Sequence, residues 1–149
     1  MKLRLFVVGR MVSELAEYEA RFKKRLSGDC QLSVIELAEG RSKQVNQRKQ
    51  EEEKSILKAV KPNFILFDEH GKQWGSQKWA AYLERLQGNA EQDFVIGGAA
   101  GVSDVVRSKA AQIWGLSMLT LPHQLARVLV VEQLYRAWSI TQGHPYHRE

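Results

Sequence analysis

The sequence predicts an α/β fold, built on a parallel sheet with helices on both of its faces. Over 149 residues, short runs rich in β-branched or aromatic side chains alternate five times with segments of helical periodicity. This alternation is typical of strand–helix–strand units, which build parallel sheets. Because the chain shows no linker or repeat and is long enough to bury one core, we expect a single domain over residues 1–149.

The first half of the chain contains two predicted strands, each followed by a helix. The apolar run LRLFVV (3–8) is the first strand and ends at Gly9. The next helix should begin at Ser13, because a serine hydroxyl is a typical N-cap. Its apolar positions recur at helical spacing and form one stripe: Leu15, Tyr18, Phe22 and Leu26. QLSVIEL (31–37) is the second strand, and a polar helix follows over about residues 44–60.

The second half continues the alternation. NFILFD (63–68) is almost continuously apolar, as expected for a strand covered on both faces. Ser76 is the expected cap of the next helix, and DFVIGG (93–98) is the fourth strand. The remaining predicted elements are a short helix over about residues 103–112, a fifth strand GLSMLTL (115–121) and, after Pro122, a helix over about residues 123–141.

The last helix is apolar around almost its whole circumference. Its apolar residues are Leu125, Val128, Leu129, Val130, Val131, Leu134, Tyr135, Trp138 and Ile140. A helix of this kind is buried on several sides. One side can face the sheet, and a second copy of the chain in a two-fold homodimer would cover the other. The alternative is that a neighbouring helix of the same chain covers it.

Composition excludes several classes of protein. No apolar stretch is long enough to span a membrane, and the N-terminus resembles a strand rather than a signal peptide. The single cysteine, Cys30, permits no intrachain disulfide, which fits a cytoplasmic location. One cysteine and the HPYH sequence cannot complete a zinc site, so we expect no metal. The net charge of +5 is compatible with a polyanionic partner without requiring one.

Glycines follow the fourth predicted strand in the stretch VIGGAAG. Gly97, Gly98 and Gly101 allow a ligand to approach the backbone closely, and ligands of open α/β sheets bind at the carboxyl ends of strands. The pattern matches neither the dinucleotide fingerprint nor the P-loop, so a simple tight turn is the alternative. The segment LSMLTLPH (116–123) would place a second strand end beside this turn if the two strands are neighbours.

Two groups of basic residues and the chain end complete the possible sites. The basic groups are Arg21, Lys23, Lys24 and Arg25, then Arg41, Lys43, Arg48 and Lys49. Glu51, Glu52 and Glu53 follow the second group, which is therefore either a solvated helix face with internal ion pairs or a phosphate-binding surface. Ordering the six residues HPYHRE (144–149) would cost about 6–12 kcal/mol of backbone entropy, so this tail either frays or docks.

Four motifs in this order resemble the ribosomal RNA large subunit methyltransferase H family of the SPOUT superfamily. They are IGG (96–98), LTLPH (119–123), RVLVVEQLYRAWSI (127–140) and HPYHRE (144–149). The resemblance implies a homodimer with a C-terminal trefoil knot that binds S-adenosylmethionine. It further implies methylation of N3 of a pseudouridine in the 23S rRNA of the large subunit, on the assembled ribosome. The alternative function is a nucleotide- or ribosome-binding factor without catalysis.

The resemblance also implies roles for individual residues. The cofactor pocket would use Phe67, Gly97, Gly98, Leu116, Ser117, Met118, Leu119, Thr120 and Leu121. Phe67 occupies a position that resembles leucine elsewhere in the family, and Ala99 and Ala100 replace more polar residues of the glycine turn. The groups that could remove the proton or hold the RNA are His144, Tyr146, His147 and Arg148 of the tail, with Arg127 and Arg136 of the last helix. Which of them is the general base, and which subunit's tail serves which pocket, stays open.

Overall fold

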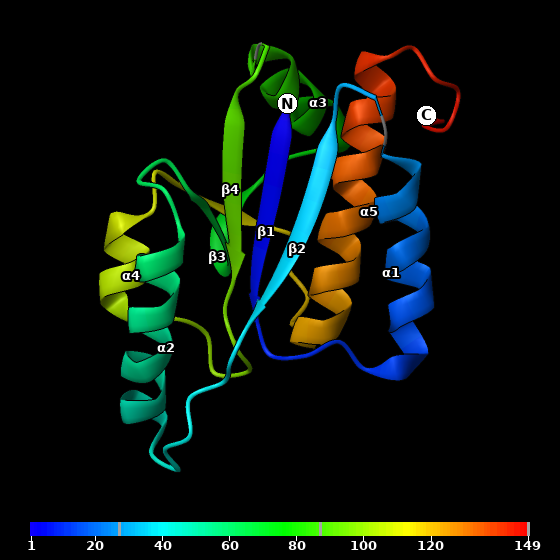
Figure 1. The fold of residues 1–149 in the computed structure, drawn as a ribbon. Coiled ribbons are helices and arrows are strands. Elements are labelled where there is room, and N and C mark those ends of the chain that lie inside the picture. Colours follow the sequence, from blue (N-terminus) through cyan, green and yellow to red (C-terminus); the bar gives the residue numbers. More distant parts are fainter. Residues whose placement is uncertain (27, 87, 149) are drawn as a thin grey trace.

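The computed structural model describes residues 1–26, 28–86 and 88–148, and it contains five strands and five helices among them (Figure 1). Their order is β1 (Lys2–Val8), α1 (Ser13–Arg25), β2 (Gln31–Leu37), α2 (Val45–Ala59), β3 (Ile65–Gln73), α3 (Ser76–Arg85), β4 (Glu91–Ile96), α4 (Asp104–Lys109), β5 (Gln112–Gly115) and α5 (His123–Thr141). No helix in the described part of the chain is long and apolar enough to cross a membrane.

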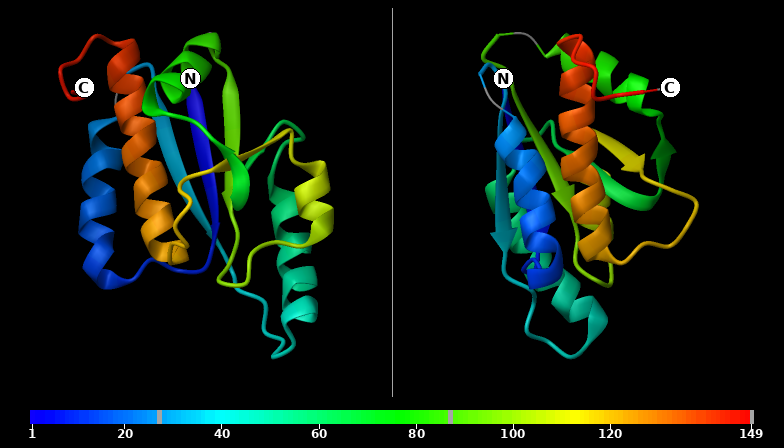
Figure 2. Two further views of the ribbon diagram at one scale, coloured as in Figure 1. Left: turned by 180° about the vertical axis from the view of Figure 1, so that it is seen from behind. Right: turned by 90° about the vertical axis from the view of Figure 1, so that its right-hand side faces the viewer.

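The five strands form one sheet in the order β2-β1-β4-β3-β5, and every neighbouring pair is parallel. Since successive side chains of a strand point to opposite faces, each strand contributes to two cores. Leu5 of β1 lies in one core and Phe6 in the other. The first core is covered by α1, α3 and α5, and the second by α2 and α4 (Figures 1 and 2). The predicted parallel sheet with helices on both faces is confirmed.

The fifth strand is shorter than predicted and lies earlier in the chain. It covers Gln112–Gly115 instead of residues 115–121, because its partner β3 ends its pairing at Gln73, opposite Gly115. Beyond that point the Ser117 hydroxyl accepts a hydrogen bond from the N–H of Leu119 at 2.9 Å, and the segment forms a loop. The preceding helix α4 ends at Lys109, three residues before its predicted end.

Two predicted helix caps are wrong. Ser13 and Ser76 are the first residues of α1 and α3, and the capping positions belong to Val12 and Gly75. The Ser76 hydroxyl instead donates to Gln133 of α5 at 2.6 Å and ties the two helices together.

Helix α5 lies between α1 and α3 on the same face of the sheet, and it contacts both. Val130, Leu134 and Ala137 are fully or almost fully buried. Neighbouring helices of the same chain therefore cover much of its apolar circumference. Near its N-terminal end, however, Leu125 remains 41% exposed.

Candidate cofactor pocket

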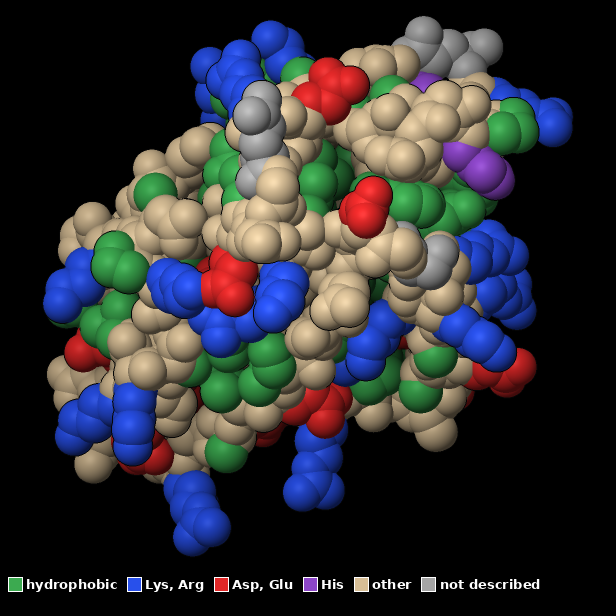
Figure 3. Space-filling view, turned by 45° about the horizontal axis from the view of Figure 1, so that its top comes forward, with side chains coloured by type: hydrophobic (Ala, Val, Ile, Leu, Met, Phe, Trp, Pro, Cys, Tyr) green, Lys and Arg blue, Asp and Glu red, His purple; other side chains and the backbone are tan. Residues whose placement is uncertain are grey.

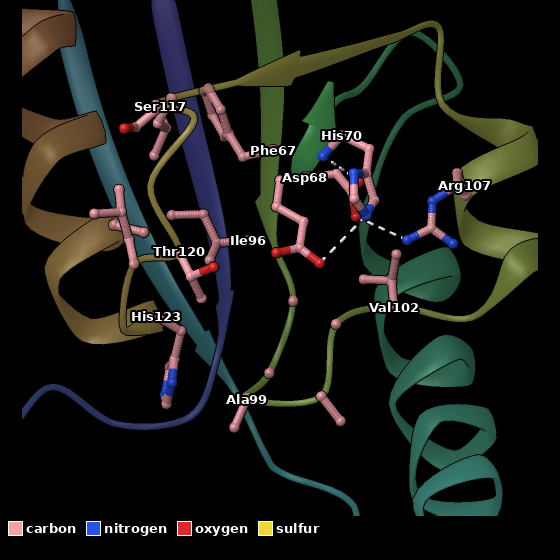
Figure 4. A pocket seen from close by; sticks show the side chains of 18 of the residues that line it. Phe67, Asp68, His70, Ile96, Ala99, Val102, Arg107, Ser117, Thr120 and His123 are labelled. Atoms are coloured by element: carbon pink, nitrogen blue, oxygen red, sulfur yellow. Dashed lines mark hydrogen bonds and ion pairs between the residues drawn. The ribbon is translucent and has the colours of Figure 1, made fainter. Parts of the chain in front are cut away.

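A cavity of about 500 Å³ opens at the carboxyl end of β4, beside residues 67–70 of β3 and the loop that follows β5. This is the edge at which ligands of parallel α/β sheets bind. Ser117, Thr120 and His123 lie on one side of it, and Val102 and Arg107 lie on the other (Figure 4). The sequence-predicted residues that line it are Phe67, Gly97, Gly98, Leu116, Ser117, Leu119, Thr120 and Leu121.

The glycine turn forms one edge of the cavity because no side chain would fit there. A Cβ at Gly97 would lie 2.6 Å from Cγ1 of Val102, and one at Gly98 would lie 3.1 Å from Oε1 of Glu52. The turn is closed by the N–H of Gly101, which donates to the carbonyl of Gly98 at 2.9 Å. Gly101 has a φ of +82°, a conformation that favours glycine. The turn therefore presents bare backbone to a ligand.

The loop after β5 faces this turn although β4 and β5 are not neighbours, since β3 lies between them in the sheet. Its members Leu116, Ser117, Leu119, Thr120 and Leu121 all line the cavity. Met118 is the exception: it does not line the cavity, and its side chain is 92% exposed.

Phe67 supplies the apolar floor. It is 7% exposed, and its ring stacks on Trp79 at 5.5 Å and on Phe94 at 5.8 Å between centroids. Trp114 meets the same ring edge-on at 6.1 Å. These contacts hold Phe67 rigidly, so its cavity-facing edge is a fixed apolar surface for a flat ligand group.

A charged wall, which the sequence analysis missed, lies next to Phe67. Nη2 of Arg107 donates to Oδ1 of Asp68 at 2.7 Å, and the N–H of His70 donates to the other carboxylate oxygen at 3.0 Å. Burial alone would raise the pKa of Asp68, but these hydrogen bonds and the charge of Arg107 outweigh it and lower that pKa below its ordinary value. Asp68 is therefore ionised at neutral pH. Its position directly after the apolar residues of β3 was the signal that could have identified it.

The tail is docked, but not at this cavity. The Tyr146 ring lies 4.8 Å from the ring of Tyr135, and the guanidinium of Arg136 lies 4.8 Å from its centroid. The Tyr146 hydroxyl donates to Glu132 at 3.2 Å, and Nη1 of Arg136 lies 3.1 Å from Nδ1 of His147. Burial and the nearby charge of Glu132 raise the pKa of Tyr146. Three of the predicted residues thus form one cluster.

This cluster lies at the opposite end of α5 from the cavity (Figures 1 and 2). Cavity residue His123 is the first residue of α5, and the tail follows its last turn. The tail contacts Glu132 and Arg136, which lie about 14–20 Å along the helix axis from His123, so the tail and the cavity of one chain do not meet. His144 and Arg148 are exposed, and Nδ1 of His144 accepts the N–H of Tyr146 at 3.2 Å.

The comparisons with known proteins agree with this geometry. The family model described as "Predicted SPOUT methyltransferase" matches residues 1–147. The chain belongs to this family. Proteins named ribosomal RNA large subunit methyltransferase H resemble it along their whole length: 41% identity in Thiobacillus denitrificans and 40% in Hydrogenovibrio crunogenus, each covering 100% of both chains. The Pseudomonas putida protein is 36% identical over 99% of this chain and 100% of its own.

Solved structures show the same fold at low sequence identity. A probable methylase family protein from Haemophilus influenzae aligns with a TM-score of 0.56 and 14% identity, over 99% of this chain and 70% of that one. A protein from Bacillus anthracis aligns with a TM-score of 0.53 and 13% identity, over 99% and 98% of the two chains. These likenesses concern the SPOUT methyltransferase fold only.

Arg127, predicted as a site residue, lies neither at the cavity nor in the tail cluster of this family member. Its side chain is buried, and its Nε and Nη2 donate to both carboxylate oxygens of Glu19 at 2.6 and 2.9 Å. Nη1 donates to Glu36 at 2.6 Å. Arg127 therefore joins α5, α1 and β2.

Within the described residues, no group of three or more His, Cys, Asp or Glu side chains is placed to hold a metal ion.

Proposed function

We propose that the protein transfers a methyl group from S-adenosylmethionine to N3 of a pseudouridine in 23S rRNA, acting as a homodimer on the assembled ribosome. The observation that carries the proposal is the cavity in which the bare glycine turn faces the loop of residues 116–121. Membership of a methyltransferase family and the names of the full-length relatives support it. The methyltransferase family model and the names of the relatives do not favour the non-catalytic alternative.

The residues present fit the proposed cofactor. The cavity volume of about 500 Å³ lies within the range of small-molecule sites. Phe67 offers an apolar surface for the adenine, and the turn at Gly97 and Gly98 offers backbone groups for the polar parts. The cofactor, when bound, supplies an electrophilic methyl group. Ionised Asp68 and its partner Arg107 provide charges of both signs at the wall.

Methylation also requires that the ring nitrogen lose its proton, and the tail holds groups suited to this. His147 and Tyr146 lie together with Arg136, so a proton acceptor and a cation are close to each other. Within one chain their contacts with Glu132 and Arg136 lie 9 and 13 residues after cavity residue His123, which is about 14–20 Å along the axis of α5. If two copies pack with their α5 helices antiparallel, the tail of one lies beside the cavity of the other.

We also infer that the C-terminal part of the chain is threaded as a trefoil knot. Two observations support this: family membership, and the close approach of the loop after β5 to the turn after β4. The knot would hold these two segments together without a disulfide or a metal.

A mixed-dimer experiment tests the shared site. Gly98→Val should displace the glycine turn of one chain, because a Cβ there would lie 3.1 Å from Oε1 of Glu52 and 3.3 Å from Cγ1 of Val8, and it leaves the tail intact. Deletion of residues 144–149 leaves the cavity intact. Each variant alone should be inactive on ribosomes. Dimers reassembled from equal amounts should recover about one quarter of the wild-type activity, because half are mixed and each mixed dimer has one complete site.

Two controls keep this result interpretable. Calorimetry should show that the truncated chain binds S-adenosylmethionine with nearly wild-type affinity, while Gly98→Val does not bind it. A mixture that stays inactive would contradict a site shared between subunits. An active truncated enzyme would contradict any role of the tail, and a wild-type protein that binds no S-adenosylmethionine would support the non-catalytic alternative.

A further inference from the structure

Basic side chains from two loops and one helix gather beside the cavity mouth. We propose that this basic rim, formed by Arg10, Arg41, Lys43, Arg48 and Lys49, binds the sugar-phosphate backbone of the rRNA around the target base. The inference rests on the proposed function and adds the surface by which the substrate is held.

Contacts within the chain place the rim at the cavity. Lys49 of α2 lines the cavity itself. The carbonyl of Arg10 accepts a hydrogen bond from Gln124 at 2.6 Å, and Gln124 is the neighbour of cavity residue His123. The loop of residues 38–44 lies against α2 close to Lys49, because a Cβ at Gly40 would lie 2.6 Å from the backbone oxygen of Arg48. The two loops follow β1 and β2, so they meet at the carboxyl edge of the sheet.

The rim cations are not neutralised by the chain. Among the described residues, no carboxylate lies within ion-pair distance of any of the five side chains. Arg10 acts only at longer range, where its charge contributes to the lowered pKa of Glu36, whose main partner is Arg127. Arg10, Arg41 and Lys43 are exposed. A polyanion could therefore contact them without displacing an existing partner.

The three glutamates that follow the rim in the sequence, residues 51–53, form hydrogen bonds with groups other than the side chains of the rim. Glu51 accepts the N–H of Arg41 at 2.7 Å, and buried Glu52 accepts the N–H of Gly40 at 2.9 Å. Glu53 accepts the Ser103 hydroxyl at 2.6 Å. The alternative of a helix face with internal ion pairs is thus not what the structure shows, since these carboxylates bind backbone amides and a hydroxyl instead.

The same hydrogen bonds fix the loop that carries Arg41 and Lys43. In addition, the Ser42 hydroxyl accepts the N–H of Gln44 at 3.2 Å and donates to Gln47 at 3.2 Å. A loop held in this way loses little further freedom when a ligand binds, which favours affinity. Arginine matches phosphate oxygens with two parallel hydrogen bonds, and lysine adds a point charge.

The face at the amino edge of the sheet lacks such a gathering. Figure 3 shows Lys and Arg side chains spread over it, interrupted by acidic and apolar groups. In the other basic group, two arginines lie against rings of their own helix: Arg21 over Tyr18 at 5.3 Å and Arg25 over Phe22 at 5.3 Å. The rim thus differs from the remaining positive charge in lying beside the cavity.

The test is the double variant Arg41→Gln/Lys43→Gln, whose two exposed residues do not line the cavity. The matched control is Lys58→Gln/Lys109→Gln, which removes the same charge at exposed positions at the C-terminal ends of α2 and α4. Methylation of ribosomes and binding of a 23S rRNA fragment are measured at several salt concentrations. For the rim variant we expect the KM for RNA to rise about tenfold, and the log–log salt slope of binding to fall by about 1.4–1.8.

In the same variant the turnover number, the calorimetric affinity for S-adenosylmethionine and the melting temperature should match wild type. Neither side chain forms an ion pair or a hydrogen bond with another residue that the structure describes. The control variant should retain the wild-type KM and salt slope. Equal behaviour of the two variants would overturn the inference, as would binding to anionic lipid vesicles without binding to RNA. Because the fragment-binding assay needs no catalysis, it reports on the rim even if wild-type protein proves unable to methylate.

Discussion

Replacing Arg127 with methionine should unfold the protein more easily rather than disable its chemistry. The Glu19 and Arg127 side chains are only 8% and 5% exposed, and two hydrogen bonds join them. Removing one partner of a buried pair leaves the other charge uncompensated, which costs about 3–5 kcal/mol. The third bond, to the 39% exposed carboxylate of Glu36, should contribute only about 0–1 kcal/mol because solvent screens it.

Urea denaturation followed by circular dichroism measures this loss, at one fixed protein concentration because a dimer's stability depends on it. With a slope of about 2 kcal/mol per molar urea, the midpoint should fall by about 1.5–2.5 M. The matched control is Glu19→Met/Arg127→Met, which removes both charges from the buried site. It should recover most of the lost stability, since an apolar pair of similar volume can replace a buried ion pair.

The pH dependence gives an independent check. The hydrogen bond from Arg127, followed by that from the N–H of Met11, lowers the pKa of Glu36 below its ordinary value of 4.5. A carboxylate with a lowered folded-state pKa stabilises the fold above its unfolded pKa, and that contribution is lost as the pH falls through the folded value. Wild-type stability should therefore fall more steeply below about pH 4.5 than the stability of Arg127→Met.

One result would refute the reasoning. If Arg127→Met has the wild-type urea midpoint but a greatly reduced turnover number, then Arg127 acts on the substrate and its role is not to form a stabilising buried ion pair.

Two further predictions follow from packing. Gly71→Ala would place a methyl group 2.4 Å from the backbone carbon of Trp114, so β3 and β5 must separate and the melting temperature should fall by about 3–10 °C. Gly75→Ala should change the melting temperature little, because a Cβ there would meet no described atom within 4 Å. Equal melting temperatures of the two variants would contradict this account. Cys30 is fully buried, and burial raises the pKa of its thiol to about 11. A colourimetric thiol reagent at pH 8 should therefore react slowly with the native protein and rapidly with the protein in denaturant. A fast reaction with the native protein would show that the region around Cys30 opens.

Sequence patterns predicted the sheet and its layers because, in long segments, the spacing of apolar residues follows from which side chains are buried. Strand ends were harder to predict. The alternation of apolar and polar residues in 115–121 resembles a strand, but pairing stops where the neighbouring strand stops, and no local signal reveals that. The serine caps failed for a similar reason, since Ser76 binds Gln133, which is 57 positions away in sequence.

At the cavity, too, some features could be predicted from the sequence and others could not. Gly97 and Gly98 were identifiable as candidates because glycines after a strand let a ligand approach the backbone closely, although a simple tight turn was the alternative. The pair of Asp68 and Arg107 spans 39 residues and forms only because the sheet order places the end of β3 near α4. The docked tail was one of two predicted states, and the contacts of Tyr146 decide between them.

A homodimer is expected from the sequence and from the structure on different grounds. The all-round apolar character of α5 suggested a partner, yet α1 and α3 of the same chain flank that helix. What now calls for a second copy is distance: the groups suited to proton removal lie at one end of α5, and the cavity lies at the other. The tail contact nearest to the cavity is that with Glu132, which lies nine residues and about 14 Å along the helix axis from His123. If tail and cavity serve one reaction, two chains must therefore supply them.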